Sequence, residues 1–180
     1  MRLRTATLLL AALGLLTAGC SGDKKPQTLP SLTPSPSATA TPVVIPSAAT
    51  VHDAYGAAAF VRFYFAQLNA AFSNADPAAF DGLVEPSCDT CKTYRASAEQ
   101  LRAMHQRIDG DSIRVVAAEA PPEQNGRIAV DVRLTSPPRK VLAADGSVVQ
   151  DLPQGKTTHR TVIVQRVATG WRIFGIAAAP

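Results

Sequence analysis

Apolar side chains follow a helical spacing in the first part of the globular segment. Residues 57–73 carry an apolar side chain at every fourth position, namely Phe60, Tyr64, Leu68 and Phe72. This spacing predicts an amphipathic helix with one buried face. A shorter helix is predicted for residues 77–84, because the proline at its start has the backbone angle of a first helical turn. A third helix is predicted for residues 91–108, with an inward series of Tyr94, Ala98, Leu101, His105 and Ile108.

Beyond Gly110 the spacing of apolar residues changes from helical to alternating. Residues 127–134 show the change most clearly, because every second side chain is branched and apolar. The other predicted strands are 112–119, 141–144, 147–150, 158–167 and 171–176. The dipeptides Asn125-Gly126 and Asp145-Gly146 indicate tight turns. Helices followed by antiparallel strands predict an α+β domain, with the N-terminal helices packed on a curved antiparallel sheet.

The N-terminal part of the chain shows neither pattern. Residues 1–19 contain two early arginines, an uncharged apolar core and small residues at the end, which is the pattern of a secretory signal peptide. The apolar run is shorter than the roughly 20 residues that cross a bilayer. Residues 20–52 are rich in proline, serine and threonine, and six of the chain's 14 prolines lie within residues 26–46. This composition predicts a disordered tether and leaves residues 53–180 as the globular domain.

The end of the predicted signal peptide, Leu16-Thr17-Ala18-Gly19-Cys20, resembles the lipobox of bacterial lipoproteins. The resemblance implies that Cys20 is the first residue of the mature protein and carries a diacylglyceryl group, with a further N-acyl chain. Two or more acyl chains hold a protein durably on a membrane. We therefore expect a lipoprotein anchored to the extracytoplasmic face of the cell membrane. The alternative is an ordinary secretory signal in which Cys20 has no role.

The distribution of charge argues against nucleic acid as a partner. The chain has 18 basic and 14 acidic residues and a formal net charge of +4. Four of the basic residues and one of the acidic residues lie in residues 1–50, so the remainder carries a net charge of only +1. A phosphate-binding surface requires a concentrated basic patch. No cluster of lysine and arginine stands out in the sequence of the globular domain.

Cys88 and Cys91 form the most specific local motif of the domain. An exported protein folds under oxidising conditions, so the first expectation is a disulfide that stabilises the turn between two helices. Three other interpretations stay open. A thioredoxin-like redox pair has the same spacing but normally follows a strand. A structural zinc site would need two further ligands, and the last alternative is two free thiols.

Residues 59–64, 68–72 and 85–91, taken with the lipobox and the tether, resemble a family of actinobacterial lipoproteins that is itself a domain of unknown function. The resemblance implies a cell-surface lipoprotein with a paired-cysteine turn. It implies no catalytic residues. The order of helices and strands also resembles the cones of the nuclear-transport-factor-2-like (NTF2-like) proteins, which often enclose a pocket.

Five residues are candidates for lining such a pocket, namely Tyr64, His105, Asp131, Trp171 and Phe174. Each also has a structural interpretation as a core or surface residue. The sequence contains no nucleophile elbow, HExxH zinc motif, P-loop or dinucleotide fingerprint. We therefore expect no metal and no cofactor beyond the lipid on Cys20, and a non-catalytic domain that binds a cell-envelope protein, a glycan or a small ligand. The alternative is a small-molecule enzyme of the isomerase or hydrolase type, which a cavity with converging buried ionisable groups would favour.

Overall fold

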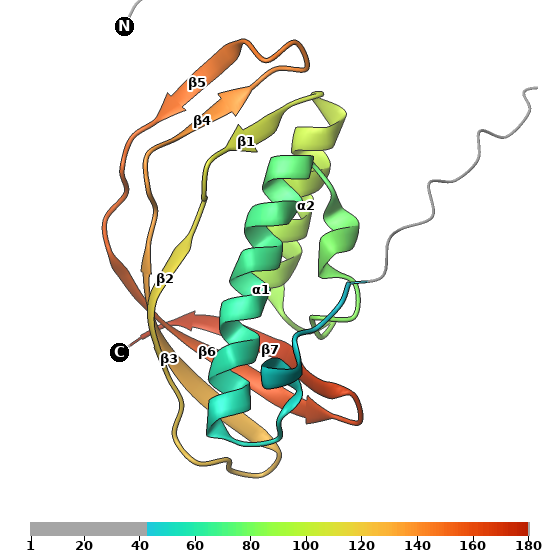
Figure 1. The fold of residues 1–180 in the computed structure, drawn as a ribbon, viewed down its shortest axis with the longest axis vertical. Coiled ribbons are helices and arrows are strands. Elements are labelled where there is room, and N and C mark those ends of the chain that lie inside the picture. The colour runs from blue at the N-terminus through green and yellow to red at the C-terminus, as the bar shows by residue number, and fades with distance from the viewer. Residues whose placement is uncertain (1–42, 180) are drawn as a thin grey trace, which may run out of the picture. The chain divides into compact units, whose positions relative to one another are not determined.

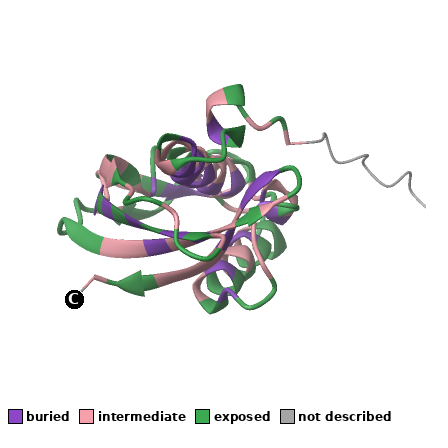
Figure 2. Cartoon of the chain, turned by 90° about the horizontal axis from the view of Figure 1, so that it is seen from below, coloured by how far each residue is buried: buried purple, intermediate pink, exposed green. Residues whose placement is uncertain are grey.

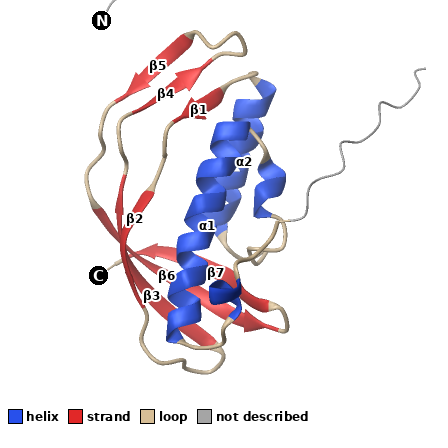
Figure 3. Cartoon of the chain, viewed as in Figure 1, coloured by secondary structure: helices blue, strands red, loops and turns tan. Residues whose placement is uncertain are grey.

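The computed structural model describes residues 43–179 (Figure 1). The predicted signal peptide, Cys20 and the tether up to residue 42 lie outside the described residues. The elements follow in the order η1 (Ser47–Thr50), α1 (Ala54–Asn74), η2 (Pro77–Phe80), α2 (Asp89–Ala103), β1 (Arg107–Asp109), β2 (Arg114–Glu119), β3 (Arg127–Thr135), β4 (Arg139–Leu142), β5 (Val148–Leu152), β6 (Thr158–Val167) and β7 (Gly170–Ala178). Helices first and antiparallel strands afterwards confirm the predicted α+β class (Figure 3).

The seven strands form two antiparallel sheets. The larger sheet has the order β2-β3-β6-β7, and the smaller one has the order β1-β4-β5. In Figure 1 the smaller sheet continues the larger one at one end, and together they curve around α1 and α2. The sheet therefore has a concave face toward the helices and a convex face away from them.

The alternating pattern of β3 shows which face of the larger sheet packs against the helices. Ile128, Val130, Val132 and Leu134 are all buried, and the charged residues between them are exposed. They meet the apolar stripe of α1, in which Phe60, Tyr64, Phe65 and Leu68 are almost inaccessible to solvent. Buried residues consequently gather between the helices and the sheet (Figure 2).

Prolines and a glycine lie in the connections where the chain passes from one sheet to the other. Pro137 and Pro138 separate β3 from β4, and Pro153 and Gly155 lie between β5 and β6. Proline has no backbone N–H and cannot continue a hydrogen-bonded ladder. The Gly155 N–H donates to the Ser136 carbonyl at 2.8 Å and joins the two interrupted connections. The smaller sheet is therefore free to turn away from the larger one.

Asn69 of α1 stabilises the third interruption, between β1 and β2. Its Nδ2 donates to the carbonyl of Ile113 at 2.7 Å, and its Oδ1 accepts from the backbone N–H groups of Ser112 and Ile113, both at 3.0 Å. One side-chain amide therefore satisfies three backbone groups that the sheet leaves unpaired.

The predicted second helix, residues 77–84, is wrong in its extent. Only the 3-10 turn η2 forms, and Gly82 then adopts a φ of 75°. The following backbone pairs with β7: the Ile173 N–H donates to the Leu83 carbonyl, and the Glu85 N–H donates to the Ile173 carbonyl. Contact with a distant strand thus ends the helix early.

The predicted third helix is also too long, and the inward position predicted for His105 is wrong. Helix α2 ends at Ala103, and His105 is exposed with a φ of 52°. The Gln106 N–H donates to the Leu101 carbonyl and the His105 N–H to the Arg102 carbonyl, which is a Schellman cap. Such caps usually contain glycine, and because His105 occupies this position no signal in the sequence marked the helix end. The next residues form β1, which the periodicity did not predict.

The packed part of the chain begins before residue 53. Residues 43–52 were assigned to the tether, yet Ala49 is buried and Val43 and Ile45 pack against the core. The Trp171 Nε1–H donates to the Val51 carbonyl at 2.7 Å. A Cβ at Gly56 would lie 1.9 Å from the Val51 oxygen, so only glycine permits this approach. These contacts involve residues far apart in the sequence, and composition alone could not indicate them.

Candidate functional site

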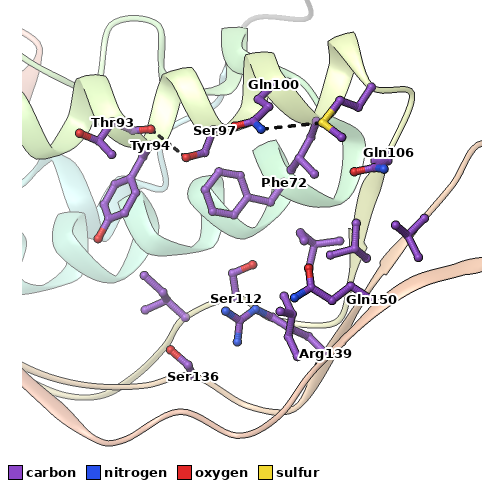
Figure 4. A pocket seen from close by; sticks show the side chains of 17 residues that line it. Phe72, Thr93, Tyr94, Ser97, Gln100, Gln106, Ser112, Ser136, Arg139 and Gln150 are labelled. Carbon is purple, nitrogen blue, oxygen red and sulfur yellow. Dashed lines mark hydrogen bonds between the residues drawn. The ribbon is translucent and has the colours of Figure 1, made fainter. Parts of the chain in front are cut away.

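A cavity of about 580 Å³ lies between α2 and the smaller sheet. This volume falls within the range of about 300–1,000 Å³ that is typical of small-molecule sites. Figure 4 shows α2 along one side and the sheet and its connections along the other. The cavity exists because the smaller sheet turns away from the larger one at the proline-containing breaks.

The helical wall of the cavity is mixed in polarity. Helix α2 contributes Tyr94, Ser97, Gln100 and Leu101, its C-cap residue is Met104, and α1 contributes Phe72. The rings of Phe72 and Tyr94 pack edge to face, with centroids 6.5 Å apart. Burial raises the pKa of the Tyr94 phenol, and the nearby Arg160 partly opposes that change. Tyr94 therefore presents a neutral hydroxyl at physiological pH.

The sheet wall contains the charged group of the cavity. β4 and β5 contribute Arg139, Val141, Gln150 and Leu152. Ser112 and Ser136 lie on the connections, and Ser112 is the polar residue that the core buries most completely among those described. Arg139 is the one charged residue in the lining, which contains no carboxylate, histidine or thiol in the described part of the chain. A cavity with converging buried ionisable groups would have favoured an enzyme. The ionisable side chains in this lining are Arg139 and Tyr94, and both are only half-buried.

None of the candidate pocket residues from the sequence lines this cavity. Tyr64 lies in the core, where its ring contacts Phe65 and Phe80 with centroids 5.4 and 6.2 Å away. Its hydroxyl has no partner among the described residues, and burial raises its pKa, with a smaller contribution from Tyr94. His105 lies in the exposed cap of α2.

Trp171, Phe174 and Asp131 are likewise structural. Trp171 is buried and binds Val51 through its indole N–H, as described above. The Arg127 guanidinium lies 3.7 Å from the centroid of Phe174, a cation–π contact on the convex face of the sheet. Asp131 is exposed and accepts a hydrogen bond from the Thr161 hydroxyl at 3.2 Å. Trp171 and Phe174 thus have the structural roles that were the alternative to a pocket, and Asp131 borders a different cavity of about 370 Å³ on the larger sheet. Alternation and helix periodicity indicate burial but not which buried surface borders a void.

The cavity residues themselves had only a weak signal in the sequence. Arg139 follows two prolines and precedes Val141 at the strand spacing of two, so it lies on the same face as an apolar residue. A charged residue in that position is the one local sign that this face borders solvent rather than core. The strand predicted from the sequence begins at residue 141 and does not include Arg139.

Cys88 and Cys91 form a disulfide, as predicted. Both cysteines are buried, and Cys88 is the N-cap of α2, where its sulfur accepts from the Cys91 N–H. The disulfide therefore holds the first turn of α2. No cluster of three or more potential metal ligands occurs in residues 43–179, and no helix in this range has the length and apolarity to cross a membrane.

The structure defines an α+β domain in which helices cover a curved antiparallel sheet and leave a ligand-sized cavity at one end. Residues 33–176 match the model of a protein family described as "Family of unknown function (DUF6318)". The chain belongs to this family. No curated protein sequence matches the chain.

Several solved structures resemble the domain. The intermembrane space region of the chloroplast protein ARC6 is 13% identical over 72% of this chain and 99% of that chain, with a TM-score of 0.52. A putative scytalone dehydratase from Novosphingobium aromaticivorans is 10% identical over 67% and 89%, with a TM-score of 0.45. An NTF2-like protein of unknown function in nutrient uptake from Rhodospirillum rubrum is 19% identical over 67% and 98%, with a TM-score of 0.41. At these identities the likeness concerns the fold.

Proposed function

We propose that this protein is a lipid-anchored protein of the extracytoplasmic membrane face whose domain binds a small ligand in the cavity between α2 and the smaller sheet. The cavity is the observation that supports the proposed ligand binding. Its volume suits a small molecule, and its lining combines apolar side chains with neutral hydroxyl and amide groups and one arginine. Such a lining fits recognition better than acid–base catalysis, which requires groups that exchange protons near neutral pH.

The proposed location depends on the N-terminal sequence. Small residues directly before Cys20 follow a short apolar segment and a basic start, the arrangement of a lipoprotein signal. The Cys88–Cys91 disulfide is consistent with an oxidising compartment outside the cytoplasm. The proline-rich segment would let the domain stand away from the membrane, where ligands of the cell envelope are accessible.

The anchor is tested with a Cys20→Ser variant expressed beside the wild-type chain. The wild-type protein should enter the detergent phase on Triton X-114 partition, and its N-terminal peptide should carry acyl groups by mass spectrometry. The variant should lose both properties, and a Ser21→Ala control should keep them. An unmodified Cys20 in the wild-type protein would refute the lipid anchor.

Ligand binding is tested with a neutral fluorescent probe, N-phenyl-1-naphthylamine, on the full chain carrying Cys20→Ser. Ser97→Trp should abolish the rise in probe fluorescence, because the indole would occupy the cavity. Ala96→Trp is the matched control, since Ala96 is the preceding residue of α2, is exposed and does not line the cavity. Equal binding by the two tryptophan variants would show that the cavity is not the binding site.

A further inference from the structure

From the charges around the cavity we infer that its ligand is an amphipathic anion, an apolar molecule with one carboxylate, sulfonate or phosphate group that Arg139 binds. This inference rests on the proposed function and adds the chemical class of the ligand. It depends on how the smaller sheet divides its charged residues between two faces.

The face of the smaller sheet that is turned away from the cavity is electrically balanced. Lys140 pairs across strands with Asp109 on β1 and with Asp151 on β5. The Lys140 ammonium lies 4.0 Å from the Asp151 carboxylate. All three residues are exposed, and none lines the cavity. Arg107 lies on the same exposed face of β1 as Asp109, so the two carboxylates of this sheet are matched by two basic residues on their own face.

The face toward the cavity is not balanced. Side chains alternate along β4, so Arg139 lies opposite to Lys140 and on the same face as Val141. The cross-strand neighbours of Arg139 and Val141 are Leu152 and Gln150, which are uncharged. No carboxylate lies within 4.0 Å of the Arg139 guanidinium in the described part of the chain. The cavity lining consequently contains one positive charge that forms no ion pair with the described residues.

The Arg139 guanidinium also has unused hydrogen-bonding capacity. Its hydrogen bond within residues 43–179 runs from Nη1 to the Pro137 carbonyl at 3.3 Å. A guanidinium carries five N–H donors, and it binds oxyanions through pairs of them. Because Arg139 is half-buried, water has only limited access to the donors that make no hydrogen bond with the protein. The remaining donors are available to a ligand inside the cavity.

Two hydroxyl groups lie on the same side of the cavity as Arg139. Figure 4 shows Ser112 and Ser136 with Arg139 on the sheet side, facing Tyr94 and Ser97 on α2. Asn69 binds the backbone N–H of Ser112 and so fixes the backbone that carries this hydroxyl. A guanidinium with adjacent hydroxyls is a suitable group of donors for one oxyanion. Leu101, Met104, Val141 and Leu152 provide the apolar remainder of the site.

The test compares two probes that differ by a single anionic group. 1-Anilinonaphthalene-8-sulfonate is N-phenyl-1-naphthylamine with an added sulfonate, so the ratio of their dissociation constants isolates the contribution of the charge. The full chain carrying Cys20→Ser should bind the sulfonate at least about tenfold more tightly, the effect of one charge-assisted contact. Arg139→Gln should remove this preference, because it should lower the affinity for the sulfonate far more than the affinity for the neutral probe. Arg139→Lys should retain part of it.

Lys140→Gln is the matched control, because it removes a positive charge from the adjacent residue on the opposite face and should preserve the preference. Laurate competing with the bound sulfonate, and dodecanol failing to compete, would extend the result to carboxylates. Vesicles of phosphatidylglycerol serve as a separate arm, and competition by vesicles alone would identify a lipid headgroup as the source of the anion.

The outcomes separate the two proposals. If Ser97→Trp does not affect the neutral probe, the cavity is not the binding site and the proposed function fails. If the neutral probe binds in the cavity but the sulfonate gains nothing, or if Arg139→Gln and Lys140→Gln change the preference equally, only the inference about an anion is refuted.

Discussion

Replacing Asn69 with alanine should destabilise the domain by more than its half-exposed position suggests. The side-chain amide makes three hydrogen bonds of 2.7, 3.0 and 3.0 Å to the backbone of Ser112 and Ile113. This backbone lies between β1 and β2, where the ladder is interrupted. Alanine would leave two N–H groups and one carbonyl without a protein partner.

The magnitude follows from the number of hydrogen bonds. Each intramolecular hydrogen bond contributes about 1 kcal/mol net, so three contribute about 3 kcal/mol to the free energy of unfolding. Partial access of water to Asn69 keeps the loss below that of three fully buried groups. In a domain of this size, a loss of about 3 kcal/mol lowers the melting temperature by about 10 °C.

Urea unfolding followed by far-UV circular dichroism measures the difference. Gln67→Ala is the matched control, because Gln67 is also a half-buried amide of α1 but its side chain makes no hydrogen bond in residues 43–179. The control should change stability by less than about 0.5 kcal/mol. Asn69→Asp keeps the acceptor and loses the donor, so its stability should be intermediate. Equal urea midpoints for Asn69→Ala and Gln67→Ala would refute the role assigned to Asn69.

Two further predictions concern the core and the disulfide. Burial raises the pKa of Tyr64 in the folded chain, so above about pH 10 the unfolded chain loses this proton first and stability falls by up to about 1.4 kcal/mol per pH unit. Tyr64→Phe should be at least as stable at neutral pH and should lose stability less steeply between about pH 9 and 11 in urea unfolding; identical slopes would contradict this. Replacing Cys88 and Cys91 together with serine should lower the free energy of unfolding by about 2 kcal/mol, since the disulfide closes a very short loop, and an unchanged urea midpoint would disprove that role.

Local periodicity in the sequence was sufficient to predict the main elements. The apolar spacing from Phe60 to Phe72 corresponds to α1, and the alternation from residue 127 to 134 corresponds to β3. The turns predicted from the dipeptides Asn125-Gly126 and Asp145-Gly146 are confirmed by the positive φ of both glycines. The disulfide was predicted from spacing and export. Each of these features depends on residues close together in the chain.

The end of α2 is also local, but its cap contains histidine in place of glycine. Contacts between distant residues decided the rest: η2 stops where residues 83–85 meet Ile173, and residues 43–52 are held by Trp171. The cavity arises in the same way, because Asn69 and the proline-containing breaks together turn the smaller sheet away from the larger one. By itself the sequence determined the elements and their class, since periodicity is a local property. Only the tertiary structure decided that Arg139 borders a void while Tyr64 and Trp171 fill the core, since a cavity is a property of surfaces that meet across the fold.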